Sequence, residues 1–418
     1  MAAQDTPGDS PELAESRIDA VVAVVPPLLH ALDALTHVGR HLHPTRLPNL
    51  VAGLQSVQAD LTGALGDFRS LSWPSQSAGL VQPIETAAEA IDRSFAGLAA
   101  AAADPDGLME AYRALRFAPR AAEALYPLAG LLGPVSLFFL DEAGRADEGL
   151  RQRLVAPDEP RPAEVARGGP GLGVMHANNA KHQRGGFSLY VPEYYDSETA
   201  YPVIVALHGG AGHGRAFLWT WLKQARSRGA ILISPTARGG TWSLMQPEVD
   251  AANIAAILDY VGEHWNLERR QILLTGMSDG GTFAYLAGLT KAASFSHLAP
   301  ISASFQPMLL QFLDQQRLQE VPIYLTHGAE DWMFPIDVAR TANAALTAAG
   351  ARVEYREIAD LSHAYPSEEN DRIVTWFLDM GAASNAALPL LTELPACATA
   401  FNTGWSDAEE ISVRPVTR

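Results

Sequence analysis

The chain has 418 residues, more than the roughly 250–300 that one hydrophobic core usually organises, so we expect two domains. An apolar share of 48% and a charged share of 18% predict a globular protein and exclude global disorder. The net charge of −17 argues against binding to nucleic acid or to an anionic membrane surface, because an acidic protein repels phosphate groups.

The start of the chain and its cysteine content bear on its location. The N-terminus lacks the positive region of a signal peptide. The first apolar run, residues 18–29, is interrupted by Pro26 and Pro27 and is short for a bilayer, so we expect no membrane span. The single cysteine, Cys397, can form neither an internal disulfide nor a paired-thiolate metal site. These features favour a cytoplasmic protein.

Residues 1–150 carry the apolar pattern of helices. Apolar side chains recur every three or four positions, as at Leu28, Leu32 and Leu35, and place one apolar stripe on each helix. The series predicts an all-α helical-bundle domain. Proline and glycine then become dense, which predicts a linker over residues 151–174. Residues 386–418 show no clear periodicity and are expected to form a C-terminal tail.

Residues 175–385 alternate between strand and helix patterns. Helical patterns, such as residues 250–264 and 282–289, separate short apolar runs that are typical of buried strands. This alternation predicts an α/β domain with a mostly parallel sheet and helices on both faces, whose active site lies at the carboxyl ends of the strands. The predicted strands are residues 187–191, 203–207, 230–234, 271–275, 298–302, 322–326 and 352–358.

The sequence Gly276-Met-Ser278-Asp-Gly280 follows one of these apolar runs and precedes a helical stretch. This is the strand–turn–helix setting in which a G-x-S-x-G serine acts as a nucleophile, because small neighbours permit a tight turn that exposes the hydroxyl. The alternative is a glycine-rich connection without chemistry. The setting favours Ser278 as a nucleophile.

A serine hydroxyl needs a base, and the base needs an orienting acid. Asp331 follows the predicted strand 322–326, and His363 follows the strand 352–358, which gives the chain order nucleophile, acid, histidine. Glu330 and Asp337 are alternative acids. We expect His327, close to Asp331, to have a structural role in its own turn.

The segment His208-Gly-Gly-Ala-Gly-His-Gly follows the strand 203–207. Glycines let a backbone approach a substrate closely, and two amide donors are needed to stabilise a tetrahedral oxyanion. We assign the donors to the amides of Gly210 and Asp279, with Gly209 shaping the turn. The alternative is that the glycines only form turns. Trp242, Trp332 and Trp219 lie near these motifs and are candidates for lining the substrate pocket.

These motifs together resemble the phospholipase/carboxylesterase branch of the α/β-hydrolases, and the polyhydroxybutyrate depolymerase and feruloyl esterase-like enzymes, over about residues 175–380. The resemblance rests on His208-Gly-Gly, Gly-Met-Ser278-Asp-Gly-Gly, His327-Gly-x-x-Asp331 and Ser-His363. It implies hydrolysis of small-molecule carboxylic esters by Ser278, His363 and Asp331, with no cofactor and no metal. The helical first domain departs from the compact members of this branch.

Several functions fit the same motifs. Within hydrolases, the alternatives to a carboxylesterase are a lysophospholipase, a thioesterase and, less well supported, a serine peptidase. A different class is a non-catalytic binding protein that has kept the fold. The helical domain has four interpretations: a lid over the acyl pocket, a homo-oligomer contact, a regulatory or partner-binding module, or a scaffold packed on the hydrolase.

Overall fold

The computed structural model describes residues 11–155 and 171–384 and divides into two compact units, Met1–Phe139 and Leu140–Arg418. The boundary lies earlier than the expected residue 150. The physical reason is Asp141, whose carboxylate accepts a hydrogen bond from Arg228 at 2.9 Å and whose amide donates to Ser227. These bonds fasten the segment that begins at Leu140 to the second unit.

Part of the predicted linker is ordered. Helix α9 (Glu148–Leu154) and the first strand, β1 (Gly173–Ala177), occupy its two ends. The rest of that linker, residues 156–170, lies outside the described residues, as do the predicted tail 386–418 and Cys397.

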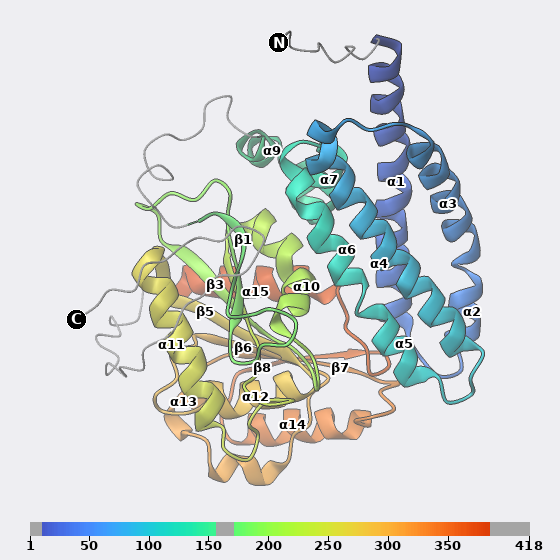
Figure 1. Cartoon of the computed structure of the whole chain (residues 1–418). Helices are drawn as coiled ribbons and strands as arrows, with labels where there is room; N and C mark the ends of the chain where they lie inside the picture. The colour runs from blue at the N-terminus through green and yellow to red at the C-terminus, as the bar shows by residue number, and fades with distance from the viewer. Residues whose placement is uncertain (1–10, 156–170, 385–418) are drawn as a thin grey trace. The chain divides into compact units, whose positions relative to one another are not determined.

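The described part of the first unit is all-helical, as the apolar spacing predicts (Figure 1). Helix α1 packs against α3, and α4 packs against α5 and α6. The buried side chains of α3, Val57, Leu61, Leu65 and Phe68, recur every three or four positions and form one stripe. The elements are α1 (Pro11–His41), α2 (Leu47–Ala52), α3 (Gln55–Ser70), η1 (Ser75–Ser77), α4 (Ala78–Ala102), α5 (Leu108–Leu115), α6 (Ala118–Leu125), η2 (Tyr126–Gly130) and α7 (Gly133–Phe138).

Helix α1 runs through Pro26 and Pro27, so the expectation that these prolines interrupt the apolar run is wrong. Each proline removes a helical hydrogen bond, which disfavours the helix by about 3 kcal/mol. Burial of Val24, Val25 and Leu28 on either side opposes that cost. With 31 residues and a mean hydropathy of 1.7 in its most apolar window, α1 is long and apolar enough to cross a membrane. A helix packed in the core of a bundle can be equally long and apolar, and the buried residues of α1 form the stripe that is typical of such a helix.

The second unit contains an eight-stranded sheet in the order β1-β2-β4-β3-β5-β6-β7-β8. Strands β1 and β2 pair antiparallel, as do β2 and β4, whereas all other neighbours are parallel. The seven predicted strands are present, and β1 is an addition. The other strands are β2 (Phe187–Val191), β3 (Tyr201–Leu207), β4 (Ile231–Pro235), β5 (Leu267–Met277), β6 (His297–Ile301), β7 (Ile323–Gly328) and β8 (Val353–Ile358).

Helices cover both faces of the sheet, which explains why its central strands are continuously apolar. Val203 and Val205 of β3 face the core formed with α11, α12 and α14, while Ile204 between them is equally buried on the opposite face. Helix α10 packs on β2, β3 and β4 and contacts α15. The helical elements are α8 (Glu142–Ala146), α9, α10 (Gly214–Arg228), α11 (Glu248–His264), α12 (Asp279–Gly288), η4 (Pro307–Gln311), α13 (Gln315–Glu320), α14 (Ile336–Ala348) and α15 (Glu369–Ser384).

Candidate active site

Ser278 lies at the sharp turn between β5 and α12. Its backbone has φ 55° and ψ −120°, a conformation that is strained for any residue with a side chain. The Ser278 amide donates to the carbonyl of Ile301 in β6 at 2.9 Å, which helps to hold the turn. The serine therefore sits at the carboxyl end of the sheet and at the N-terminus of a helix, where developing negative charge is favoured.

The glycines on either side of Ser278 are required by close backbone contacts. A β-carbon at Gly276 would lie 2.6 Å from the carbonyl carbon of Gly280. A β-carbon at Gly280 would lie 2.5 Å from the carbonyl oxygens of Leu207 and His208. Because these obstacles are backbone atoms, no rotamer change relieves them. These contacts are the reason why the two positions flanking the serine, two residues away on each side, require glycine.

Gly280→Ala is expected to destabilise the second unit by about 1–3 kcal/mol, because the added methyl group forces β3 and α12 apart. Thermal unfolding followed by circular dichroism measures the effect. Gly240→Ala is the matched control, since nothing lies within 4 Å of a β-carbon there. Equal melting temperatures for Gly280→Ala and the control would contradict the steric explanation.

Three side chains from separate strand ends form a hydrogen-bonded chain. Oγ of Ser278 lies 3.1 Å from Nε2 of His363, and Nδ1 of His363 lies 2.8 Å from Oδ2 of Asp331. A carboxylate can only accept, so Nδ1 carries the proton and Nε2 is left to accept the serine proton. All three residues are largely buried, with 5–8% of their surface exposed. This is the geometry that activates a serine nucleophile.

Asp331 is held by its own turn. Its second carboxylate oxygen, Oδ1, accepts from the amides of Met333 and Phe334 at 2.9 and 2.8 Å. His327 is fully buried, and its Nε2 donates to the carbonyl of Phe334 at 2.8 Å and lies 3.4 Å from Asp331 Oδ2. Burial lowers the pKa of His327, which keeps this ring neutral. His327 thus ties down its turn, as the sequence argument expects.

The two alternative acids lie elsewhere. The Asp337 side chain is 84% exposed and pairs with Arg340 on the surface of α14. Glu330 is half-buried, and the carboxylate that accepts the hydrogen bond from His363 Nδ1 belongs to its neighbour Asp331.

The glycine-rich loop after β3 contacts the turn at Ser278. A β-carbon at Gly209 would lie 3.6 Å from Cβ of Ser278, and one at Gly210 would lie 2.8 Å from Oδ2 of Asp279. Among the residues that the structure describes, the amides of Gly210 and Asp279 donate no hydrogen bond. Unsatisfied backbone amides are the kind of donor that can stabilise an oxyanion.

The side chains of His208 and Trp242 both donate hydrogen bonds to backbone carbonyls of this loop. His208 Nδ1 donates to the Gly209 carbonyl at 2.7 Å, and its Nε2 accepts from the Ala237 amide at 3.1 Å. Trp242 is 2% exposed, stacks on Phe283, and donates its indole N–H to the His208 carbonyl at 2.7 Å. Trp242 is thus placed to support the loop, and its burial leaves little surface for a substrate.

The other two tryptophans differ in exposure. Trp332 is 39% exposed and lies edge-on to the His363 ring, with 6.2 Å between ring centroids. Trp219 is half-buried on α10. Trp332 is thus a pocket candidate whose ring lies close to His363.

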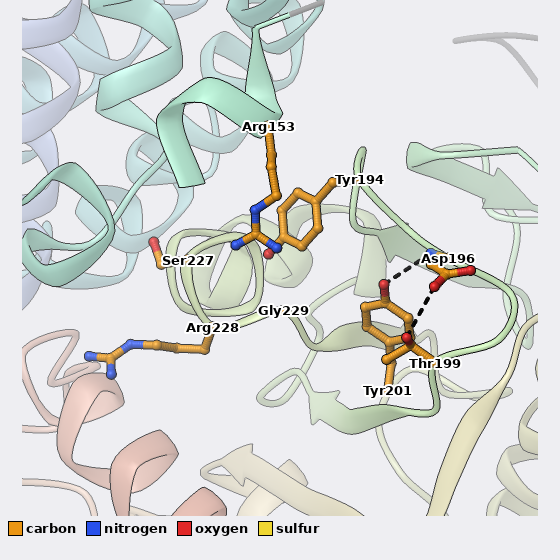
Figure 2. A pocket seen from close by; sticks show the side chains of 8 residues that line it. All are labelled: Arg153, Tyr194, Asp196, Thr199, Tyr201, Ser227, Arg228 and Gly229. Atoms are coloured by element: carbon orange, nitrogen blue, oxygen red, sulfur yellow. Dashed lines mark hydrogen bonds between the residues drawn. The ribbon is translucent and has the colours of Figure 1, made fainter. Parts of the chain in front are cut away.

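A separate cavity of about 380 Å³ lies at the C-terminal end of α10 and contains none of these residues (Figure 2). Its arginines are already engaged, because Arg153 lies over the Tyr194 ring and Arg228 pairs with Asp141. Among the described residues, no group of three or more histidine, cysteine, aspartate or glutamate side chains could hold a metal ion. The cavity lining is Arg153, Tyr194, Asp196, Thr199, Tyr201, Ser227, Arg228 and Gly229.

Comparison with known families identifies the fold. Residues 248–379, which include Ser278, Asp331 and His363, match the phospholipase/carboxylesterase family model. The second unit has the α/β-hydrolase fold. Its mostly parallel sheet with helices on both faces confirms the fold class predicted from the sequence.

Curated relatives of this α/β-hydrolase include esterases. The chain is 27% identical over 133 residues to the probable feruloyl esterase C of Aspergillus niger. This aligned region is 30% of this chain and 49% of the relative. It is 31% identical over 115 residues to the bifunctional acetylxylan esterase/xylanase XynS20E of Neocallimastix patriciarum. That region is 27% of this chain and 16% of the relative. The matches therefore span half or less of these two relatives.

Two solved structures are similar to part of the chain. A thermostable esterase matches with a TM-score of 0.41 and 18% identity, covering 49% of this chain and 62% of the other. SOBER1 of Arabidopsis thaliana matches with a TM-score of 0.37 and 19% identity, covering 43% of this chain and 99% of the other.

Proposed function

We propose that this α/β-hydrolase cleaves carboxylic esters, with Ser278 as the nucleophile, His363 as the general base and Asp331 as the orienting acid. The observation that carries the proposal is the hydrogen-bonded chain from Ser278 Oγ through His363 to Asp331, at 3.1 and 2.8 Å. The family match over residues 248–379 and the esterase relatives support the same reaction class.

The reaction would proceed in two half-reactions. Ser278 Oγ attacks the ester carbonyl carbon while His363 Nε2 takes the hydroxyl proton, and the amides of Gly210 and Asp279 stabilise the oxyanion. The intermediate collapses to an acyl-serine as His363 returns the proton to the leaving alcohol. Water, activated by the same imidazole, then attacks the acyl-serine and releases the acid. Asp331 stabilises the imidazolium that forms in each half-reaction.

The acyl group is proposed from two observations. Relatives carry the names feruloyl esterase and acetylxylan esterase, which point to aromatic and to short acyl groups. Trp332, half-exposed beside His363, offers an aromatic face on which a planar acyl group could stack. We therefore favour short or aromatic acyl esters as substrates. A cytoplasmic location and homo-oligomer contacts through the helical unit remain proposals from the sequence.

Two measurements on the purified full chain test this function. Hydrolysis of p-nitrophenyl acetate, butyrate and octanoate, together with methyl ferulate, gives the acyl preference. Labelling with a fluorophosphonate, followed by peptide mass spectrometry, identifies the reactive serine. We expect turnover of short or aromatic esters and a label on Ser278. A folded protein that neither hydrolyses these esters nor accepts the label would favour a non-catalytic binding role.

A further inference from the structure

Arg184, on the loop between β1 and β2, joins two other loops at the carboxyl end of the sheet. Its Nη1 donates to the carbonyl of Gly212 at 2.7 Å, in the loop after β3. Its Nε donates to the carbonyl of Gly239 at 2.7 Å, in the loop after β4, and Nη2 donates to the same oxygen. One guanidinium group thus spans segments that are distant in the sequence.

Each of the two loops reaches the oxyanion donors from a different side. The Gly212 amide donates to the Gly209 carbonyl at 3.0 Å, which closes the turn that contains Gly210. In the other loop, the Thr241 hydroxyl donates to the Asp279 carboxylate at 2.6 Å. Gly210 and Asp279 are the residues whose amides would bind the oxyanion. Arg184 is therefore connected to the turn of Gly210 through Gly212, and to Asp279 through the loop that carries Thr241.

The surroundings of Arg184 suit a fixed clamp. The side chain is half-buried, and desolvation by this burial lowers the pKa of Arg184, although a guanidinium stays protonated at neutral pH. The hydrogen bonds named above that Arg184 donates all go to the backbone carbonyls of Gly212 and Gly239, and not to a carboxylate. Asp250, which is buried, is the carboxylate whose charge acts on Arg184. The amides of Arg238 and Ser243 donate to Asp250.

We propose that Arg184 is the positioning residue of the oxyanion hole: it fixes the distance between the Gly210 and Asp279 amides by clamping the loops after β3 and β4. This role of Arg184 rests on the proposed ester hydrolysis, because it concerns the oxyanion of that reaction. Preorganised donors stabilise the charge that develops in the transition state more than they stabilise the bound substrate. Loss of the clamp should therefore lower kcat more than it raises KM.

The test compares Arg184→Ala and Arg184→Lys with Arg238→Ala. Lysine keeps the charge but cannot bridge both carbonyls as a planar fork does. Arg238 is an exposed arginine on the same loop as Gly239, and its side chain is outside the proposed clamp. We expect kcat for p-nitrophenyl butyrate to fall by about 10- to 100-fold in Arg184→Ala, by less in Arg184→Lys, and to stay near wild type in Arg238→Ala.

The affinity for a boronic acid is a measurement that a purely structural role of Arg184 would leave unchanged. The boronic acid forms a tetrahedral anionic adduct with an active serine and so occupies the oxyanion hole. We expect its affinity to fall in parallel with kcat/KM, and added methylguanidinium to restore part of the activity of Arg184→Ala. Thermal unfolding of each variant separates this effect from loss of the fold. If Arg184→Ala unfolds, Arg184→Lys carries the comparison.

The outcomes separate the two proposals. Wild-type kcat and boronate affinity in a folded Arg184 variant would overturn the role of Arg184 and leave ester hydrolysis standing. A fall in substrate binding alone, with boronate affinity kept, would also overturn it. A wild-type chain that is folded but inert to esters and to the boronic acid would overturn both proposals.

Discussion

Replacing Ser278 by alanine should lower kcat for ester hydrolysis by about 10⁵- to 10⁶-fold, because the acyl-enzyme can no longer form. The small residual rate would come from the oxyanion donors and from substrate binding. The fold should persist, since the methyl group of alanine fits the space of the serine side chain and the strained turn is set by the glycines around it.

Progress curves with p-nitrophenyl butyrate at high enzyme concentration measure this loss. Ser304→Ala is the matched control, because Ser304 lies on the loop after β6, and its backbone amide and carbonyl bond to Thr282. The control should retain wild-type kcat. Equal activity of Ser278→Ala and the wild type would show that Ser278 is not the nucleophile.

Replacing Asp331 by asparagine should lower kcat by about 10⁴-fold. The asparagine oxygen can still accept from the amides of Met333 and Phe334, so the turn is kept. The new NH₂ group, however, would face Nδ1 of His363 and donate to it. The imidazole proton would then sit on Nε2, directed at Ser278, and the ring could no longer accept the serine proton.

The two alternative acids provide matched controls for Asp331→Asn. Glu330→Gln and Asp337→Asn each remove one negative charge from the same segment of the chain, so they report the effect of charge without the effect on His363. The rates of all three variants should be compared across pH 6–9 under single-turnover conditions. A loss in Glu330→Gln or Asp337→Asn as large as that in Asp331→Asn would contradict the assignment of the acid.

The part of this fold that depends on local order could be predicted from the sequence. Short apolar runs such as Val203 to Leu207 indicate strands covered on both faces, and the three-to-four spacing of Leu61, Leu65 and Phe68 indicates one stripe of a helix. The turn at Ser278 could also be predicted. Gly276 and Gly280 are required there by contacts within a few residues of the serine or with the adjacent strand.

Features that depend on partners far along the chain could not be predicted in this way. The prolines of α1 disfavour a helix locally, yet burial against the bundle keeps the helix continuous. The segment from Leu140 belongs to the second unit because Asp141 meets Arg228. Trp242 was a pocket candidate by its position after a strand, but its partners, His208 and Phe283, place it beneath the glycine loop.

The sequence by itself determined which residue types stand at the ends of which strands, since hydrophobic period and turn sterics are local properties. It supplied Ser278, Asp331 and His363 as candidates but no distance between them. Only the tertiary structure decided that His363 lies 3.1 Å from a serine 85 positions earlier, and that Arg184 reaches both Gly212 and Gly239. Such distances follow from strand order and register, which are fixed by packing the whole sheet against its helices.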